Sequence, residues 1–122
     1  MRILIVQDGA DRQIEIKAML PGNDCTTVDS VHKARRVFNL HRRNYFNLII
    51  VSDLIDEVTL IASTLVRYFR ISDFTGLIVG ISDDERTHDR MIAVGADAVA
   101  VREQIAETVR DLIEHREAEG RL

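Results

Sequence analysis

The sequence predicts a doubly wound α/β domain built on a five-stranded parallel sheet. Short aliphatic runs recur along the 122 residues, and segments with apolar residues at steps of three and four separate them. Helical crossovers of this length join parallel strands and are right-handed. We therefore expect a single three-layer domain over residues 1–122, with the strand order 2-1-3-4-5. Its core should span residues 1–115, and the charged segment 116–122 should form a frayed tail.

Three strands are expected in the first half of the chain. Arg2–Val6 is an aliphatic run, and Cys25–Val28 is a shorter run of the kind found at a sheet edge. The central strand is the run Leu48–Val51, which ends at Ser52 and Asp53. Four consecutive aliphatic residues indicate a strand that is buried on both faces.

Two helices are expected between these strands. The first should run from Asp11 to Leu20 and end at the turn Pro21-Gly22-Asn23. Its inward-facing residues should be Ile14, Ala18 and Met19. Ser30 can cap the second helix. The expected apolar face of that helix comprises Val31, Ala34, Val37, Phe38 and His41.

The second half of the chain continues the alternation. A third helix has the clearest apolar stripe, which comprises Val58, Ile61, Ala62, Leu65, Val66 and Phe69. Leu77–Ile81 should form the fourth strand and Glu85–Val94 the fourth helix. After the turn Gly95-Ala96-Asp97, Ala98–Val101 should form the fifth strand. The buried stripe of the last helix comprises Ile105, Val109, Leu112 and Ile113.

The composition narrows the possible functions. The chain is 46% hydrophobic and 30% charged, and it has no apolar run long enough to cross a bilayer. Met1 leads directly into the first strand, so we expect no signal peptide and a cytoplasmic location. Cys25 is the only cysteine, which excludes an internal disulfide, and we expect it to be a small buried residue. The net charge of −4 argues against nucleic-acid binding.

Four expected strands end in polar side chains. Asp8, Asp53, Ser82 and Arg102 follow the first, third, fourth and fifth strands. The carboxyl ends of parallel strands meet at one edge of the sheet, where open α/β folds bind ligands, so these four residues form the candidate site. The same residues also suit structural roles, with the carboxylates and the hydroxyl as helix caps and Arg102 as an ion-pair partner of Asp8 or Asp53.

In this order and spacing, the segments resemble the receiver domains of two-component response regulators, which are CheY-like. The resemblance covers essentially the whole chain. Ile3–Asp8 is similar to the first strand and acidic pair of that family, and Ile49–Asp53 is similar to its phosphoacceptor strand. Ile78–Ser82 is similar to the strand that ends in a hydroxyl residue, and Gly95–Arg102 is similar to the segment that ends in a lysine.

The resemblance implies a stand-alone signalling domain that receives a phosphoryl group from a histidine kinase or a phosphotransfer protein. Asp53 is then the acceptor, because its carboxylate can form an acyl phosphate. Asp8 and Asp53 would hold Mg²⁺, while Ser82 and Arg102 would contact the added phosphoryl oxygens. Such a domain catalyses at most its own phosphorylation and dephosphorylation. It acts on an unknown downstream protein, and its fourth helix, fifth strand and fifth helix form the expected contact and homodimer face.

Several residues depart from the family pattern and favour an alternative, a pseudo-receiver that works as a protein-interaction module without phosphorylation. Gln7 replaces one acid of the pair, which removes a negative charge from the metal site. Arg102 replaces the lysine with a larger, planar cation. Glu103 stands where the family has a proline, and Val99 stands where an aromatic residue is frequent.

The acceptor position has two interpretations. Counting from Phe46-Asn47 places Ser52 at the acceptor position, whereas the apolar run and its end select Asp53. We prefer Asp53, because only a carboxylate can form the acyl phosphate. A third class of function, a flavodoxin-like small-molecule binder, is disfavoured because no strand is followed by a phosphate-binding loop rich in Gly, Ser and Thr.

The second helix and its end are basic. The basic residues are Lys33, Arg35, Arg36, Arg42 and Arg43. Such a group usually forms a solvated face, and the alternative is a contact surface for an acidic partner.

Overall fold

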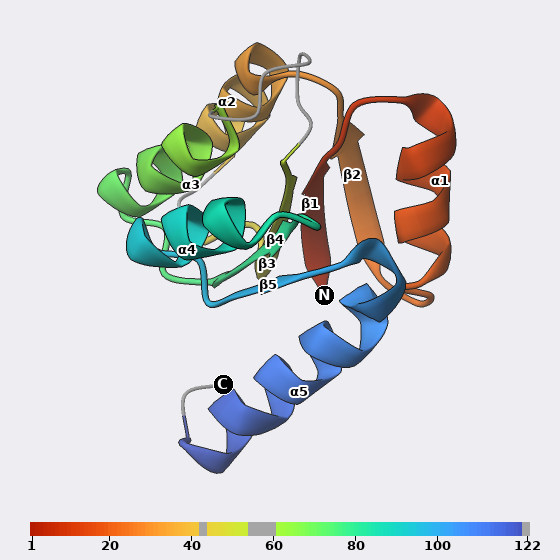
Figure 1. Cartoon of the computed structure of the whole chain (residues 1–122), viewed down its shortest axis with the longest axis vertical. Helices are drawn as coiled ribbons and strands as arrows, with labels where there is room; N and C mark the ends of the chain where they lie inside the picture. Colours follow the sequence, from red (N-terminus) through yellow and green to blue (C-terminus); the bar gives the residue numbers. More distant parts are fainter. Residues whose placement is uncertain (42–43, 54–60, 121–122) are drawn as a thin grey trace.

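A five-stranded parallel sheet forms the centre of the fold (Figure 1). The computed structural model describes residues 1–41, 44–53 and 61–120. The strands are β1 (Arg2–Val6), β2 (Asp24–Val28), β3 (Leu48–Ser52), β4 (Leu77–Ile81) and β5 (Ala98–Ala100), in the order β2-β1-β3-β4-β5. The observed order confirms the predicted fold class.

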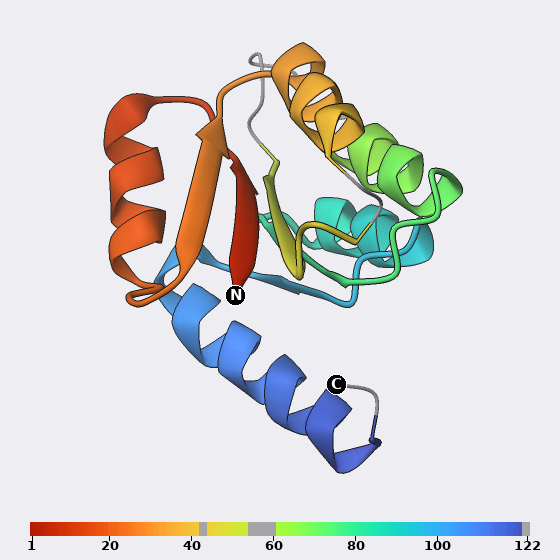
Figure 2. The same ribbon diagram turned by 180° about the vertical axis from the view of Figure 1, so that it is seen from behind.

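Helices cover both faces of the sheet (Figures 1 and 2). One face packs against α2 (Val31–Leu40), α3 (Ile61–Ile71) and α4 (Glu85–Ala93). The other face packs against α1 (Ala10–Ala18) and α5 (Ile105–Ala118). The last helix continues past residue 115, where the core was predicted to end. Over the described ranges, no helix is both long and apolar enough to span a membrane.

Successive residues of a strand pack against different helix layers, because side chains alternate between the two faces of a strand. In β1, Leu4 and Val6 pack in the layer of α2, α3 and α4, whereas Ile3 and Ile5 pack in the layer of α1 and α5. Every residue of β3 is buried, as predicted for the central strand. The edge strand β2 has one buried residue, Val28, which agrees with its predicted place at the edge.

The inward face of α1 differs from the prediction. Ile14 is 65% exposed and Ala18 is exposed, whereas Ile16 is fully buried. The Nε2 group of Gln13 donates a hydrogen bond of 2.8 Å to the carbonyl oxygen of Gln7, so Gln13 and Ile16 face the sheet. Positions 14 and 18 and positions 13 and 16 both fit a helical period, and the packing of Ile16 against the sheet decided between them.

The end of α2 also differs from the prediction. Ser30 caps the helix as expected, because its hydroxyl accepts a hydrogen bond of 3.1 Å from the Lys33 amide. His41, predicted on the buried face, is exposed, and its ring stacks on Tyr45 with 3.9 Å between the ring centroids. The predicted stripe residue Val58 lies outside the described residues.

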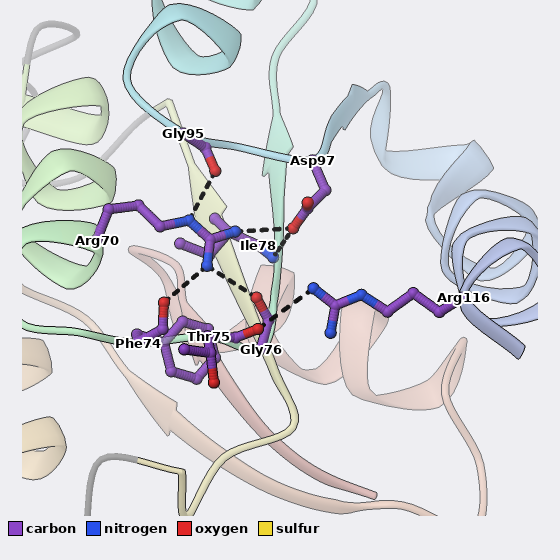
Figure 3. A network of polar contacts seen from close by, with 8 residues as sticks. All are labelled: Arg70, Phe74, Thr75, Gly76, Ile78, Gly95, Asp97 and Arg116. Carbon is purple, nitrogen blue, oxygen red and sulfur yellow. Dashed lines mark hydrogen bonds and ion pairs between the residues drawn. The ribbon is translucent and has the colours of Figure 1, made fainter. Parts of the chain in front are cut away.

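A polar network fixes the amino end of β4 (Figure 3). The guanidinium of Arg70, at the end of α3, donates hydrogen bonds to the carbonyl oxygens of Gly95 (2.8 Å), Phe74 (2.9 Å) and Gly76 (2.9 Å). It also pairs with the Asp97 carboxylate at 2.9 Å. One side chain therefore joins the end of α3 to the α3–β4 connection and to the turn between α4 and β5.

Two further contacts extend this network. The Asp97 carboxylate accepts a hydrogen bond of 2.8 Å from the Ile78 amide, and Arg116 of α5 donates one of 3.2 Å to the Thr75 carbonyl oxygen. Because β4 begins here, the network lies at the amino edge of the sheet. The candidate site lies at the opposite, carboxyl edge.

Candidate functional site

The carboxyl ends of β1 and β3 lie side by side in register. Val6 pairs with Val51 and Ser52 pairs with Ile81, so continuing the ladder places Asp8 beside Asp53. The hydrogen-bonded ladder continues one residue beyond β3, because the Asp53 amide donates to the Ile81 carbonyl oxygen at 2.8 Å. The backbone therefore fixes where the two carboxylates leave the sheet.

Side chains alternate between the two faces of a strand, and this places the two candidate acceptors, Ser52 and Asp53, on opposite faces of the sheet. Val51 packs in the layer of α2, α3 and α4, and so the next residue of the same parity, Asp53, continues on that side. Ser52 lies on the opposite side of the sheet and is 1% exposed, whereas Asp53 is half-buried. Asp8 continues the side of Val6, which is also the side of Asp53. The two aspartates thus share both an edge and a face.

Ser82 follows β4 on the same side, because Ile78 of that strand packs in the layer of α2, α3 and α4. Its amide donates to the Ala100 carbonyl oxygen at 3.1 Å, and its hydroxyl accepts a hydrogen bond of 3.0 Å from the Asp84 amide. The carbonyl oxygen of Ser82 accepts a hydrogen bond of 2.6 Å from His88 Nε2. Ser82 therefore belongs to the turn that starts α4, while Asp84 is the capping residue of that helix.

Arg102 follows β5 and lies toward the layer of α1 and α5. It starts a 3₁₀ turn, Arg102–Gln104, and its Nη1 lies 3.9 Å from Oε2 of Glu15 on α1. Its Nε is buried and has no hydrogen-bond partner among the described residues. Ala100, two residues earlier, packs in the layer of α1 and α5, which is the side that Arg102 continues. When the alternation is extended past the strand ends, Asp8, Asp53 and Ser82 fall on one side of the sheet. Arg102 instead pairs with Glu15, an acid that the sequence analysis did not single out.

Gln7 directly follows β1 and precedes Asp8. It is fully buried, and its Nε2 donates a hydrogen bond of 2.8 Å to the Asp8 carbonyl oxygen. Its Oε1 is buried without a hydrogen-bond partner among the described residues. Burying an amide oxygen without a hydrogen-bond partner costs free energy.

The oxygen donors at this edge suit a hard divalent cation. Mg²⁺ prefers carboxylate and water oxygens and is commonly held by one or two carboxylates. Asp8 and Asp53 supply two, while Gln7 stands where the resemblance to receiver domains predicts a further acid. No group of three His, Cys, Asp or Glu residues that could hold a metal ion occurs in the described part of the chain. An open hollow of about 390 Å³ borders Asp8 and is lined by residues 8–12. These oxygen donors therefore fit Mg²⁺, with two carboxylates as the charged ligands.

The chain is similar in structure to solved receiver domains. The structure of NtrX from Brucella abortus matches with a TM-score of 0.80 at 16% identity, and the match covers 97% of this chain and 28% of that chain. A CheY-like response regulator receiver domain protein from Methanospirillum hungatei matches with a TM-score of 0.74 at 16% identity and 97% coverage of both chains. The signal receiver domain of a histidine kinase from Syntrophus aciditrophicus matches with a TM-score of 0.72 at 25% identity, covering 93% of this chain and 87% of that chain. The sequence itself matches no protein-family profile and no curated protein.

Proposed function

Because the chain has the CheY-like fold of response-regulator receiver domains, we propose that it is a receiver in two-component phosphorelay signalling. In this proposal Asp53 accepts a phosphoryl group from a phosphohistidine of a histidine kinase or a phosphotransfer protein. An oxygen of the Asp53 carboxylate forms a bond to phosphorus while the bond from phosphorus to the donor histidine nitrogen breaks. The signal then passes to another protein through noncovalent contacts.

The observation that carries the proposal is the register of β1 and β3. Extended past the strand ends, this register supports Asp8 and Asp53 as neighbours at the carboxyl edge, and Asp53 itself is half-buried. A carboxylate nucleophile needs an exposed oxygen and a nearby site that offsets the charge of the incoming phosphoryl group. Asp53 satisfies the first condition, and the pair of aspartates satisfies the second when it holds Mg²⁺.

The cation, when bound by Asp8 and Asp53, would offset negative charge on the phosphoryl oxygens. The protein residues have separate tasks. Asp8 orients the cation site, and the Ser82 hydroxyl donates a hydrogen bond to the phosphoryl group after rotating away from the α4 turn. Arg102 reaches the same group only if it leaves Glu15, which lies in the other layer. The face made by α4, β5 and α5 is the proposed contact with a downstream protein or a second copy, in a cytoplasmic setting.

The pseudo-receiver is the second candidate, and two observations favour it. Gln7 leaves the metal site with two carboxylates, and Arg102 is held on the far side by Glu15. A domain in that arrangement would keep one conformation and act only through its surface. The two candidates differ in one measurable property, which is whether Asp53 gains a phosphoryl group.

Phosphorylation by acetyl phosphate in the presence of Mg²⁺ tests the proposal directly. Intact-mass spectrometry should show the gain of one phosphoryl group by the wild-type chain and by Ser52→Ala, and no gain by Asp53→Asn or when EDTA is present. Ser52→Ala is the matched control, because it alters the competing acceptor position. A wild-type chain that gains no mass, and that shows no NMR shift changes with beryllofluoride, is a pseudo-receiver.

A further inference from the structure

The outer face of α2 is a basic surface that the proposed phosphorylation does not use. Ala34 and Phe38 bury the inner face of this helix. The exposed residues of the described helix include His32, Lys33, Arg35, Arg36 and Asn39. The sequence has no Asp or Glu from Ser30 to Ser52, although acidic residues outnumber basic ones in the whole chain by 20 to 16. Positive charge is therefore concentrated on one helix of an acidic protein.

Two arginines of this surface have no salt bridge to an acidic residue in the described part of the chain. Lys33 is paired with Asp29 at 2.9 Å, in the first turn of the helix. Arg35 and Arg36, by contrast, have no salt bridge to any carboxylate in the described ranges. The surface thus offers two adjacent arginines that pair with no carboxylate among residues 1–41, 44–53 and 61–120.

Arg35 is held in place before any partner binds. Its Cζ lies 4.3 Å from the centroid of the Tyr68 ring, which is a cation–π contact between α2 and α3. The Tyr68 hydroxyl donates a hydrogen bond of 3.0 Å to Asn39 Oδ1, one helical turn further along α2. The ring and the guanidinium are therefore oriented together. An oriented guanidinium loses less conformational entropy when a carboxylate binds to its N–H groups.

These side chains border a hollow on the surface. The hollow has a volume of about 530 Å³, and its lining includes Val31, His32, Arg35, Arg36 and Asn39. The stripe from Val31 to Asn39 spans roughly 12 Å at the rise of an α-helix. That length accommodates two or three acidic side chains of an extended or helical segment.

We propose that the outer face of α2 binds an acidic segment of a partner protein, with Arg35 and Arg36 pairing with its carboxylates. Charge complementarity and the small size of the stripe carry this inference. A nucleic acid is a poorer partner, because its binding relies on many phosphate contacts over a long basic surface and the net charge of this chain is −4. The proposal does not depend on phosphorylation of Asp53.

An NMR titration of the full chain with a capped hexaglutamate peptide tests the proposal, with capped hexaglutamine as the matched neutral peptide. Saturable shifts of the Arg35, Arg36 and Asn39 amides are expected with hexaglutamate alone. Binding should weaken about two- to five-fold in Arg36→Gln and more in Arg35→Gln/Arg36→Gln, since each exposed ion pair contributes up to about 1 kcal/mol. It should also weaken as salt is added.

A control variant on another helix and the choice of Arg36 as the test residue make the outcome decisive. Arg110→Gln removes an exposed arginine of α5 and should leave the affinity unchanged. Arg36 has no aromatic or ion-pair contact among the described residues, so Arg36→Gln tests the surface without disturbing the contact with Tyr68. The proposal is overturned by equal binding of the wild-type chain and the double variant, by shifts centred on another face, or by tighter binding of a single-stranded DNA oligonucleotide.

Discussion

The guanidinium of Arg70 and the carboxylate of Asp97 lie 2.9 Å apart and join the end of α3 to the turn before β5. Both side chains are mostly buried, with 23% and 29% of their surfaces exposed. The remaining N–H groups of Arg70 bind three backbone carbonyl oxygens that have no helix or strand partner at this edge. This arginine therefore satisfies a set of backbone groups that would otherwise be left unpaired.

Replacing Arg70 with methionine should lower the free energy of unfolding by about 2–4 kcal/mol, because a half-buried carboxylate and three carbonyl oxygens lose their donor. Urea denaturation monitored by circular dichroism measures the change. Arg67→Met is the matched control, since Arg67 is an exposed residue of the same helix, and it should change stability by less than about 0.5 kcal/mol. Equal effects of the two substitutions would contradict the role of the network.

Gly95 approaches the same arginine too closely for a side chain. Its φ is +121°, and a Cβ at this position would lie 2.5 Å from Cγ of Arg70. Gly95→Ala should therefore cost about 2–4 kcal/mol, from backbone strain and from displacement of Arg70. Gly22→Ala, at φ +78° with no atom within 4 Å, should cost only the conformational strain, about 1 kcal/mol. Thermal unfolding of both variants checks the difference, and a smaller loss for Gly95→Ala would refute it.

Gln7→Glu should give the site the acid that the family pattern contains. Without Mg²⁺ the variant should lose about 1–3 kcal/mol of stability, because the buried carboxyl replaces an amide that donates to the Asp8 carbonyl oxygen. With Mg²⁺ its melting temperature should rise more than that of the wild-type chain, since a ligand that binds the folded state stabilises it. Adding Asp53→Asn to this variant should reduce the gain. A rise that is the same in wild type and Gln7→Glu would show that Gln7 does not face the cation.

The reactivity of Cys25 should depend on pH. Burial raises the pKa of its thiol, an effect that nearby Lys17 opposes. The rate of alkylation by iodoacetamide should therefore reach half of its plateau at a pH above that of a free thiol. Lys17→Gln should move this midpoint higher, while Lys33→Gln on α2 should not.

The same raised pKa affects stability. The unfolded chain loses the thiol proton at a lower pH than the folded chain does. The contribution of Cys25 to stability is therefore complete below the ordinary thiol pKa and falls as the pH rises through the folded value. Denaturation of wild type and Cys25→Ser at several alkaline pH values should show this loss in wild type alone, and parallel curves would contradict it.

Much of the candidate site could be predicted from sequence because its residues directly follow aliphatic strands. Asp8, Asp53 and Ser82 need only the strand assignments and a parallel sheet to reach one edge. The partner of Arg102 could not be predicted, because Glu15 stands on a different helix and no local pattern links the two residues. Nor could the sequence predict that the Gln7 side-chain oxygen lacks a hydrogen-bond partner among the described residues, because this depends on which atoms surround the buried amide.

The sequence by itself determined the five strands, their parallel pairing and the edge at which the polar residues gather. Aliphatic runs and helical stripes are local signals, and the crossover rules convert them into a strand order. Only the tertiary structure decided which face of α1 is buried, where Arg102 points and how Arg70 joins α3 to β4 and the turn before β5. Each of these depends on contacts between residues far apart in the chain, and the free energy of such contacts is set by packing and hydrogen bonding in the folded state.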